Sequence, residues 1–466
     1  METLSTPRIL IAGTGSGVGK SLLTAGIVYQ LRKRNLSPSC CVIGPCLGQA
    51  SFLRRVSGRY VRCLDEKLLS AGQSLVALHQ AGMGADLILL EGHGGLYDGA
   101  EAGSLRGSDA EIAALTRTPT VLVIDAAPFG AGVAAVFKGY ASLADGFEVV
   151  GAILNRVAKA GQEPRPERDF YAECFGGFNL PPPLGAVPEA QLEGAMPSNV
   201  ISQRSNLTLL PRQFLLDVET LVERYVDIER LVALGGKAPP VSFNEYESAP
   251  VGRRSRIAVS DDSCFNMCFQ DNLDLLRYYG AELVTFSPLA DTALPRNIGA
   301  LYLTGACLAE YGRELSLNVS MKDAILDFAG NGGVIYSEGG GTAFLCRDYK
   351  CSLEGTKEEG IGIIPASAVP GDGLMSYLEA VTVEESVLGR AGLLLKSVSS
   401  GEWRLVNEER MVKTMRLSRS KTDPAPSFEG YSPGAQMVCT FSFVHFGSNP
   451  AVARNLVEAA QVVESL

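Results

Sequence analysis

Residues 13–21 read GTGSGVGKS and lie between a short apolar run and a stretch with a helical pattern. The run before them, Arg8–Ala12 (RILIA), is continuously apolar after its first residue, as expected of a buried parallel strand. The residues after them, Leu22–Arg34, have the spacing of a helix. A glycine-rich turn that ends a strand and opens a helix is typical of a phosphate-binding loop, because its backbone N–H groups can surround phosphate oxygens. The stretch therefore predicts a nucleotide-binding α/β domain.

The loop is a near match to the pattern G-x-x-x-x-G-K-[ST]. Gly19, Lys20 and Ser21 complete the pattern, whereas Thr14 stands at the position of the first glycine and Gly13 lies one residue earlier. We expect Lys20 to neutralise the β- and γ-phosphates of ATP and the Ser21 hydroxyl to ligate Mg²⁺. The full set of expected cofactor-binding residues is Gly13, Thr14, Gly15, Ser16, Gly17, Val18, Gly19, Lys20 and Ser21.

Further apolar runs alternate with helical stretches along the first half of the chain. They are Cys41–Ile43, Asp86–Leu90, Thr120–Ile124 and Val149–Leu154. This alternation predicts a doubly wound, mostly parallel sheet. Residues 234–255 lack apolar periodicity and are interpreted as a linker, after which a second strand–helix series begins. We therefore expect a P-loop domain over residues 1–233 and a second α/β, flavodoxin-like domain over residues 256–466.

The composition excludes several classes of function. The chain has 466 residues, with 51 acidic against 41 basic side chains and a net charge of −10, so a broad nucleic-acid surface is not expected. None of the eleven cysteines lies in a C-x-x-C pair, which favours reduced thiols and a cytoplasmic location. No apolar stretch reaches the length of about 20 residues that a membrane helix needs.

An acidic residue follows the predicted strand Asp86–Leu90. Glu91 begins the segment EGHGGLYDG, residues 91–99. Because the carboxyl ends of parallel strands face the ligand crevice, we expect Glu91 to share Mg²⁺ with Ser21 and Asp98 to contact substrate. The predicted catalytic residues are thus Lys20, Glu91 and Asp98. His93 lies in the same turn and is interpreted as a loop residue without a chemical role.

Together these motifs resemble the cobyrinic acid a,c-diamide synthase family, in which a dethiobiotin synthetase-like P-loop domain is fused to a class I glutamine amidotransferase-like domain. The resemblance covers nearly the whole chain and includes the segments at residues 91–99, 256–295 (RIAV…TALP) and 443–450 (FVHFGSNP). It implies that ATP phosphorylates a peripheral carboxylate of a corrinoid or related tetrapyrrole. Ammonia then displaces the phosphate and leaves an amide.

The second half departs from the family at its glutaminase positions. The family's turn Y-A-E-C-G-G appears as YSEGGG at residues 336–341, so Gly339 stands where the nucleophilic cysteine is expected. Glycine has no side chain and cannot form a thioester with glutamine. Of the family's H-x-H-F, only the second histidine remains, as His445. The sequence therefore predicts a degenerate glutaminase site at Gly339 and His445, with ammonia taken from solution or from a glutaminase partner.

The first half departs from the family after its second strand. The family's G-P-D-Y appears as GPCL at residues 44–47, and Cys46 is a poor ligand for Mg²⁺. Three hypotheses stay open: an ATP-dependent amide ligase acting on a tetrapyrrole, a non-catalytic nucleotide-binding homologue or regulatory subunit of a tetrapyrrole-modifying system, and a P-loop ATPase that works as a switch. The fused amidotransferase-like half argues against the last. The expected partners are a small tetrapyrrole, ammonia or a glutaminase partner, and a second copy of the chain in a homodimer.

Overall fold

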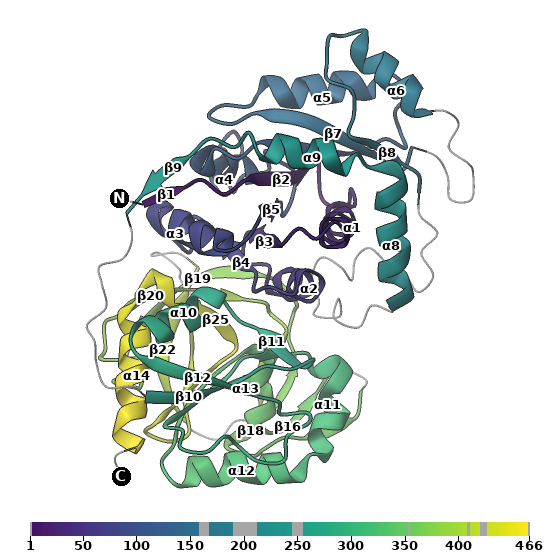
Figure 1. Cartoon of the computed structure of the whole chain (residues 1–466). Coiled ribbons are helices and arrows are strands. Elements are labelled where there is room, and N and C mark those ends of the chain that lie inside the picture. The colour runs from purple at the N-terminus through teal and green to yellow at the C-terminus, as the bar shows by residue number, and fades with distance from the viewer. Residues whose placement is uncertain are drawn as a thin grey trace. The chain divides into compact units, whose positions relative to one another are not determined.

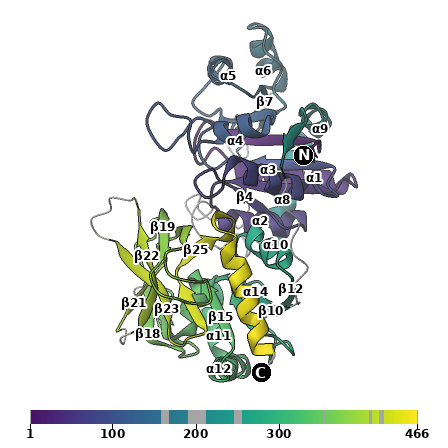
Figure 2. The same ribbon diagram turned by 90° about the vertical axis from the view of Figure 1, so that its left-hand side faces the viewer.

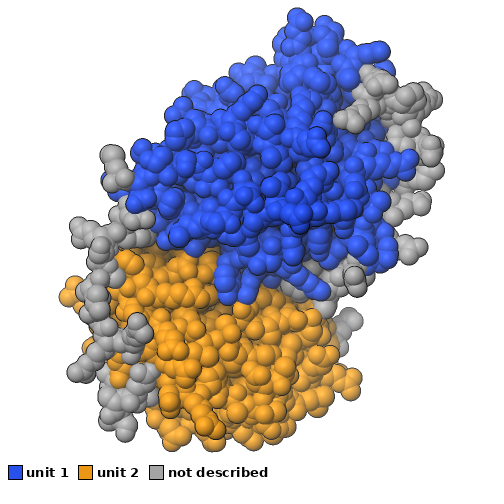
Figure 3. Space-filling model, viewed as in Figure 1, with its two compact units in different colours: residues 1–246 blue, residues 247–466 orange. Residues whose placement is uncertain are grey.

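The computed structural model describes residues 2–157, 167–189, 212–244, 255–352, 355–407, 411–419 and 426–464. The chain divides into two compact units, residues 1–246 and 247–466, which are coloured separately in Figure 3. Among the described residues, no helix is long and apolar enough to span a membrane.

A seven-stranded sheet forms the centre of the first unit, with strand order β4-β3-β5-β2-β6-β7-β8 and every neighbouring pair parallel. The strands are β2 (Arg8–Gly13), β3 (Pro38–Ile43), β4 (Arg62–Leu64), β5 (Leu87–Glu91), β6 (Thr120–Asp125), β7 (Val149–Asn155) and β8 (Gly185–Val187). The helices are α1 (Lys20–Lys33), α2 (Leu47–Ser57), α3 (Ala71–Gly82), α4 (Asp109–Thr116), α5 (Val133–Ser142), α6 (Glu167–Gly176), α8 (Arg212–Tyr225) and α9 (Ile228–Gly235) (Figure 1). The predicted doubly wound parallel sheet is confirmed.

The packing of strand β2 explains why its sequence is apolar after Arg8. Leu10 and Ala12 belong to the core cluster that includes residues of α3, α4 and α5. Ile9 points to the other face, where Gly235 at the end of α9 lies so close that an added Cβ would be 3.6 Å from the Cβ of Ile9. Both faces of the strand are therefore covered by helices, and every residue of β2 is buried.

The stretch interpreted as a linker, residues 234–255, is partly folded into the first unit. Helix α9 ends at Gly235, and β9 (Val241–Phe243) pairs antiparallel with β1 (Glu2–Leu4). Residues 245–254 lie outside the described part of the chain. The pairing of β1 with β9 joins two short strands more than two hundred positions apart, which no local periodicity indicates.

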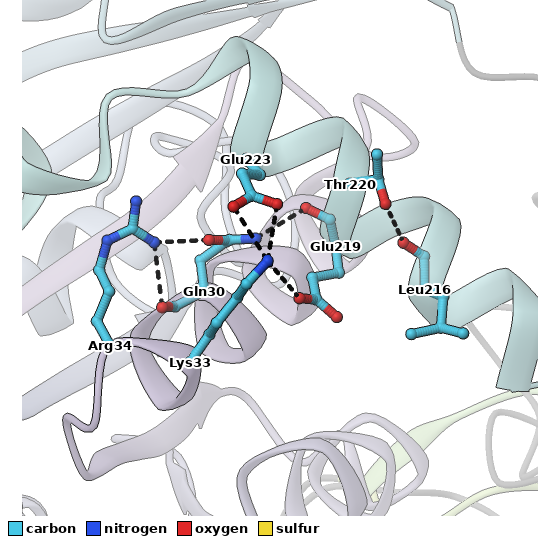
Figure 4. Close-up of polar contacts among 7 residues, drawn as sticks. All are labelled: Gln30, Lys33, Arg34, Leu216, Glu219, Thr220 and Glu223. Carbon is cyan, nitrogen blue, oxygen red and sulfur yellow. Dashed lines mark hydrogen bonds and ion pairs between the residues drawn. The ribbon is translucent and has the colours of Figure 1, made fainter.

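Helix α8 lies along α1, the helix that follows the phosphate loop. Their exposed edge carries polar contacts, in which Nζ of Lys33 lies 2.9 Å from the carboxylate of Glu223 and 3.5 Å from that of Glu219 (Figure 4). Such exposed ion pairs contribute little to stability. The close approach depends instead on Gly26 of α1, because a Cβ there would collide with Val222 and lie 2.9 Å from the carbonyl oxygen of Val218.

Substitution of Gly26 by alanine is therefore expected to lower the free energy of unfolding by about 1–3 kcal/mol, since overpacking outweighs the gain in helix propensity. Gly139→Ala is the matched control, because Gly139 lies inside α5 and no atom comes within 4 Å of its added Cβ. Urea unfolding of the two variants would show the difference. Equal stability of both would contradict the packing argument.

A ten-stranded mixed sheet forms the centre of the second unit, in the order β12-β10-β13-β15-β24-β23-β22-β19-β20-β25. Its strands are β10 (Ser255–Ser260), β12 (Ala281–Phe286), β13 (Ala300–Leu303), β15 (Val334–Glu338), β19 (Ser376–Thr382), β20 (Leu394–Ser399), β22 (Val412–Ser418), β23 (Ser427–Ser432), β24 (Met437–Thr440) and β25 (Ser442–His445). The pairs from β12 to β24 are parallel and the remaining pairs are antiparallel. The expected second α/β domain is confirmed.

Smaller elements complete the second unit. A four-stranded sheet consists of β16 (Cys346–Lys350), β17 (Lys357–Glu359), β18 (Ile364–Pro370) and β21 (Trp403–Val406), and a two-stranded one of β11 (Phe265–Met267) and β14 (Gly305–Ala306). The helices are α10 (Gln270–Tyr278), α11 (Leu308–Leu317), α12 (Val319–Gly330), α13 (Gly339–Leu345) and α14 (Ala451–Glu464). Helix α14 packs on the parallel part of the sheet (Figure 2), where its residues share a core cluster with β10, β13 and β15.

Candidate nucleotide and substrate site

The predicted phosphate loop connects β2 directly to α1. Gly17 and Gly19 have φ angles of 76° and 100°, a conformation that other residues adopt only with strain. Gly19 is the residue before the first turn of α1, and an added Cβ there would collide with the side chain of Asn155. The loop thus has the glycines where its backbone requires them.

Three side chains outside the loop hold its carbonyl groups. The hydroxyl of Tyr140 donates to the carbonyl of Thr14 at 2.9 Å, and Nδ2 of Asn155 donates to that of Val18 at 2.9 Å. Arg156 donates from Nη2 to the carbonyl of Gly17 at 2.5 Å. These bonds hold the carbonyls of Thr14, Gly17 and Val18, while the N–H of Thr14 donates to the carbonyl of Val123 at 3.1 Å and ties the loop to β6. The three donors Tyr140, Asn155 and Arg156 were not predicted as site residues. The sequence feature that could have pointed to two of them is the polar pair Asn155–Arg156 at the end of a buried strand.

The side chain of Lys20 is buried and links two loops. Its Nζ donates to the carbonyl of Gly94 at 2.6 Å and to that of Gly15 at 3.1 Å. Burial lowers the pKa of Lys20, while the nearby carboxylates of Asp109 and Glu91 oppose that change. The ammonium group therefore lies where the phosphate loop meets the loop after β5, as expected for a group that neutralises phosphate charge.

Glu91 ends β5 and is fully buried. Burial raises its pKa to about 7, against the opposing effects of the Ser21 hydroxyl and the Lys20 ammonium. Nε2 of Gln49 donates to Oε1, whereas Oε2 is buried and makes no hydrogen bond within the described residues. A buried carboxylate oxygen without a partner, beside a serine hydroxyl, fits a Mg²⁺ ligand. The structure thus brings Lys20, Ser21 and Glu91 together.

Substitution of Glu91 by glutamine is expected to stabilise the protein without ligand, and increasingly so as the pH rises. The pKa of Glu91 is raised from 4.5 to about 7 on folding, so ionisation of this side chain opposes folding. Below pH 4.5 the carboxyl is protonated in both states and the substitution has little effect. Between pH 4.5 and 7 the advantage of the variant grows, and it levels off above that range at about 3 kcal/mol.

Urea unfolding at pH 5 and pH 8 measures this effect. Glu223→Gln is the control, because this exposed carboxyl pairs with Lys33 and its pKa is lowered. The control should show no such gain. A Glu91→Gln variant that is less stable than the wild type at pH 8 would contradict the assignment of an ionised, poorly solvated carboxylate.

Asp109 is a second acid at this site that was not predicted. It is the first residue of α4, is 3% exposed, and accepts a hydrogen bond on Oδ1 from the N–H of His93 at 3.0 Å. Burial raises its pKa to about 6, and Oδ2 makes no hydrogen bond within the described residues. The sequence feature that could have pointed to Asp109 is its position at the start of a helix, directly after the helix-capping residue Ser108. Asp109 is therefore a further candidate for the metal or substrate.

Asp98 is exposed and binds its own loop, because Oδ2 accepts a hydrogen bond from the N–H of Gly95 at 2.8 Å. Its charge still acts on Lys20. Among the described residues, no three His, Cys, Asp or Glu side chains cluster into a metal cage.

Cys46 and His93 lie in contact at the same end of the sheet. Sγ of Cys46 is 2.9 Å from Nδ1 of His93. Burial raises the pKa of the Cys46 thiol to about 12, and the nearby carboxylates act in the same direction. A protonated thiol does not ligate Mg²⁺, so the expectation that Cys46 leaves the metal to other residues is consistent with the structure.

In the second unit, Gly339 follows β15 with a φ of 52° and begins α13. An added Cβ would lie 2.6 Å from Cζ of Phe443, and one at Gly305 would lie 2.6 Å from Cε1 of the same ring. His445 is buried; its Nδ1 accepts a hydrogen bond from the N–H of Gly447 at 3.1 Å, and its Nε2 lies 3.9 Å from Asp271. The ring of Phe443 thus occupies the space beside the position where the family has its nucleophile.

Comparison with known proteins agrees with this combination of a P-loop unit and an amidotransferase-like unit. Residues 256–388 match the CobB/CobQ-like glutamine amidotransferase domain. Cobyrinate a,c-diamide synthase of Syntrophotalea carbinolica is 30% identical over 98% of this chain and 99% of that one, and the enzyme of the same name from Archaeoglobus fulgidus is 32% identical over 78% and 77%. The chain therefore belongs to the cobyrinate a,c-diamide synthase family. Among solved structures, PurLQS from Thermotoga maritima is 13% identical and covers 45% of this chain and 99% of that one, with a TM-score of 0.33.

Proposed function

We propose that the protein is an ATP-dependent amide ligase that converts peripheral carboxylates of a corrinoid or related tetrapyrrole into amides. The observation that carries this proposal is the junction of Lys20, Ser21 and the buried Glu91 at the phosphate loop, in a chain that aligns over its length with cobyrinate a,c-diamide synthases. The hypothesis of a non-catalytic homologue has no comparable support, because the relatives share the name of the synthase.

The proposed reaction has two steps. A carboxylate oxygen of the substrate attacks the γ-phosphorus of ATP, the bond to the leaving ADP breaks, and an acyl phosphate forms. Ammonia then attacks the carbonyl carbon, the bond to the phosphate breaks, and the attacking nitrogen loses a proton. The first step is needed because a free carboxylate is a poor electrophile. The products are the amide, ADP and phosphate.

The residues of the phosphate loop would position the nucleotide for this reaction. Backbone N–H groups between Gly13 and Ser21 would bind phosphate oxygens, and Lys20 would neutralise charge on the β- and γ-phosphates. Ser21 and Glu91 would hold Mg²⁺, which when bound supplies further charge neutralisation on the phosphates. Asp98 stays a candidate for contact with the substrate.

Ammonia would come from solution or from a glutaminase partner rather than from the second unit of this chain. Gly339 supplies no thiol, and the ring of Phe443 fills the space beside it. The proposed location is cytoplasmic, because none of the cysteines lies in a C-x-x-C pair and reduced thiols are the expected state. We also propose that two copies of the chain assemble into a homodimer.

The direct test is an assay of the full chain with Mg-ATP and cobyrinic acid or sirohydrochlorin, supplied in parallel with glutamine or with an ammonium salt. Mass spectrometry would detect replacement of a carboxyl OH by NH₂, and phosphate release would be measured alongside. Product with ammonium but not with glutamine supports the proposal. ATP hydrolysis without any amide in either arm would contradict it.

A further inference from the structure

The ring of His93 is held on several sides at the phosphate-loop end of the first unit. Nδ1 contacts Sγ of Cys46 at 2.9 Å. The ring also lies over Gly44, whose φ is 83°, and a Cβ on Gly44 would be 3.6 Å from the Cβ and Cγ of His93. The backbone N–H donates to the buried Asp109. The orientation of the imidazole is therefore set by the turn before α2 and by the start of α4.

The Cys46 contact also favours one position for the proton on the ring of His93. Burial raises the pKa of the Cys46 thiol to about 12, so the thiol stays protonated at neutral pH. The sulfur of a thiol is a weak hydrogen-bond acceptor, whereas an unprotonated imidazole nitrogen accepts readily. The contact is therefore better satisfied when the S–H of Cys46 donates to Nδ1 than when Nδ1–H donates to sulfur. We therefore assign Cys46 as the donor and place the proton of the neutral ring on Nε2.

The Nε2–H group of His93 is available to a ligand. His93 is exposed, and within the described part of the chain its Nε2 makes no hydrogen bond. The next residue, Gly94, accepts a hydrogen bond from Nζ of Lys20 at 2.6 Å. His93 therefore belongs to the loop that the proposed γ-phosphate-binding lysine contacts, and the attacking carboxylate must approach this same end of the sheet.

We propose that Nε2–H of His93 binds the substrate carboxylate that is to be phosphorylated, and that His93 is thereby a specificity-determining residue. This inference rests on the proposed function. The chemistry at position 46 favours it, because a neutral thiol stands where the family's G-P-D-Y has an aspartate and adds no negative charge next to an incoming carboxylate. Cys46 acts as a positioning residue for the ring.

The test compares the wild type with His93→Ala and His93→Gln in the ammonium-dependent assay with cobyrinic acid. Loss of a hydrogen bond to a charged group is expected to raise KM for cobyrinic acid about ten- to a hundredfold in His93→Ala. KM for ATP should change by less than about twofold, which also shows that the site is folded. His93→Gln, which keeps an N–H donor, should recover most of the loss, and Cys46→Ser should be milder than His93→Ala.

Two results would overturn the inference: an unchanged KM for cobyrinic acid in His93→Ala, or an equal rise in the KM values for ATP and cobyrinic acid. Equilibrium dialysis of cobyrinic acid, followed by its own absorbance, separates this outcome from failure of the proposed function. If the wild type forms no amide, the proposed function fails. Weaker binding of cobyrinic acid to His93→Ala than to the wild type would still support the contact, and equal binding would reject it.

Discussion

Lys20→Ala is expected to lower the rate of ATP-dependent amidation at saturating ATP by at least about a hundredfold. The Nζ group of Lys20 is the cation that bridges the phosphate loop and the loop after β5, through the carbonyls of Gly15 and Gly94. Without it, negative charge that develops on the transferred phosphoryl group is not compensated by the protein. Steady-state phosphate release and amide formation, measured together, check this expectation.

The loss must be separated from unfolding, and the chain offers two controls. Lys33→Ala removes an exposed lysine from the other end of α1, where it pairs with Glu219 and Glu223, and should leave the rate within about twofold of the wild type. Lys20→Met replaces a buried ammonium whose pKa is lowered by burial, so folding stability at neutral pH should not fall. Undiminished turnover in Lys20→Ala would remove the basis of the proposed ligase site.

The phosphate loop could be predicted because its determinants are local. The chain carries an apolar strand, then the glycines from Gly13 to Gly19, then the Lys20–Ser21 pair. In this order they indicate a phosphate loop without information from elsewhere in the sequence. The position of Glu91 could be predicted for the same reason, since it directly follows the apolar run Asp86–Leu90 and ends β5. The structure places these residues at one end of the sheet because parallel strands share their carboxyl ends.

The remaining site residues meet through tertiary contacts that no local pattern contains. Cys46 and His93 belong to loops after different strands, and their contact joins positions 47 residues apart. Asp109 reaches His93 from the start of a helix that could also be explained by capping alone. Likewise, the replacement of a histidine by Phe443 is visible in the sequence, but its packing over Gly339 is not.

Gly339→Cys is expected to lower the free energy of unfolding by about 2–4 kcal/mol and to produce no glutaminase activity. The residue has a φ of 52°, and its new Cβ would lie 2.6 Å from Cζ of Phe443. The ring cannot move aside easily, because Gly305 adjoins it and the neighbouring N–H of Val444 donates to the buried Glu338 at 2.9 Å. Restoring the thiol alone therefore creates a clash rather than a nucleophilic site.

A double-mutant cycle with Phe443→Ala tests whether the ring of Phe443 is what excludes a side chain at position 339. Phe443→Ala alone should destabilise the second unit by about 3–5 kcal/mol, because it leaves a cavity in place of a buried ring. The double variant should be more stable than the sum of the two single effects predicts, by about 1–3 kcal/mol, since the cavity accepts the new side chain. Glutamine hydrolysis is measured in every variant. Additive effects, or glutaminase activity in Gly339→Cys by itself, would show that the pocket is open and that only the nucleophile is missing.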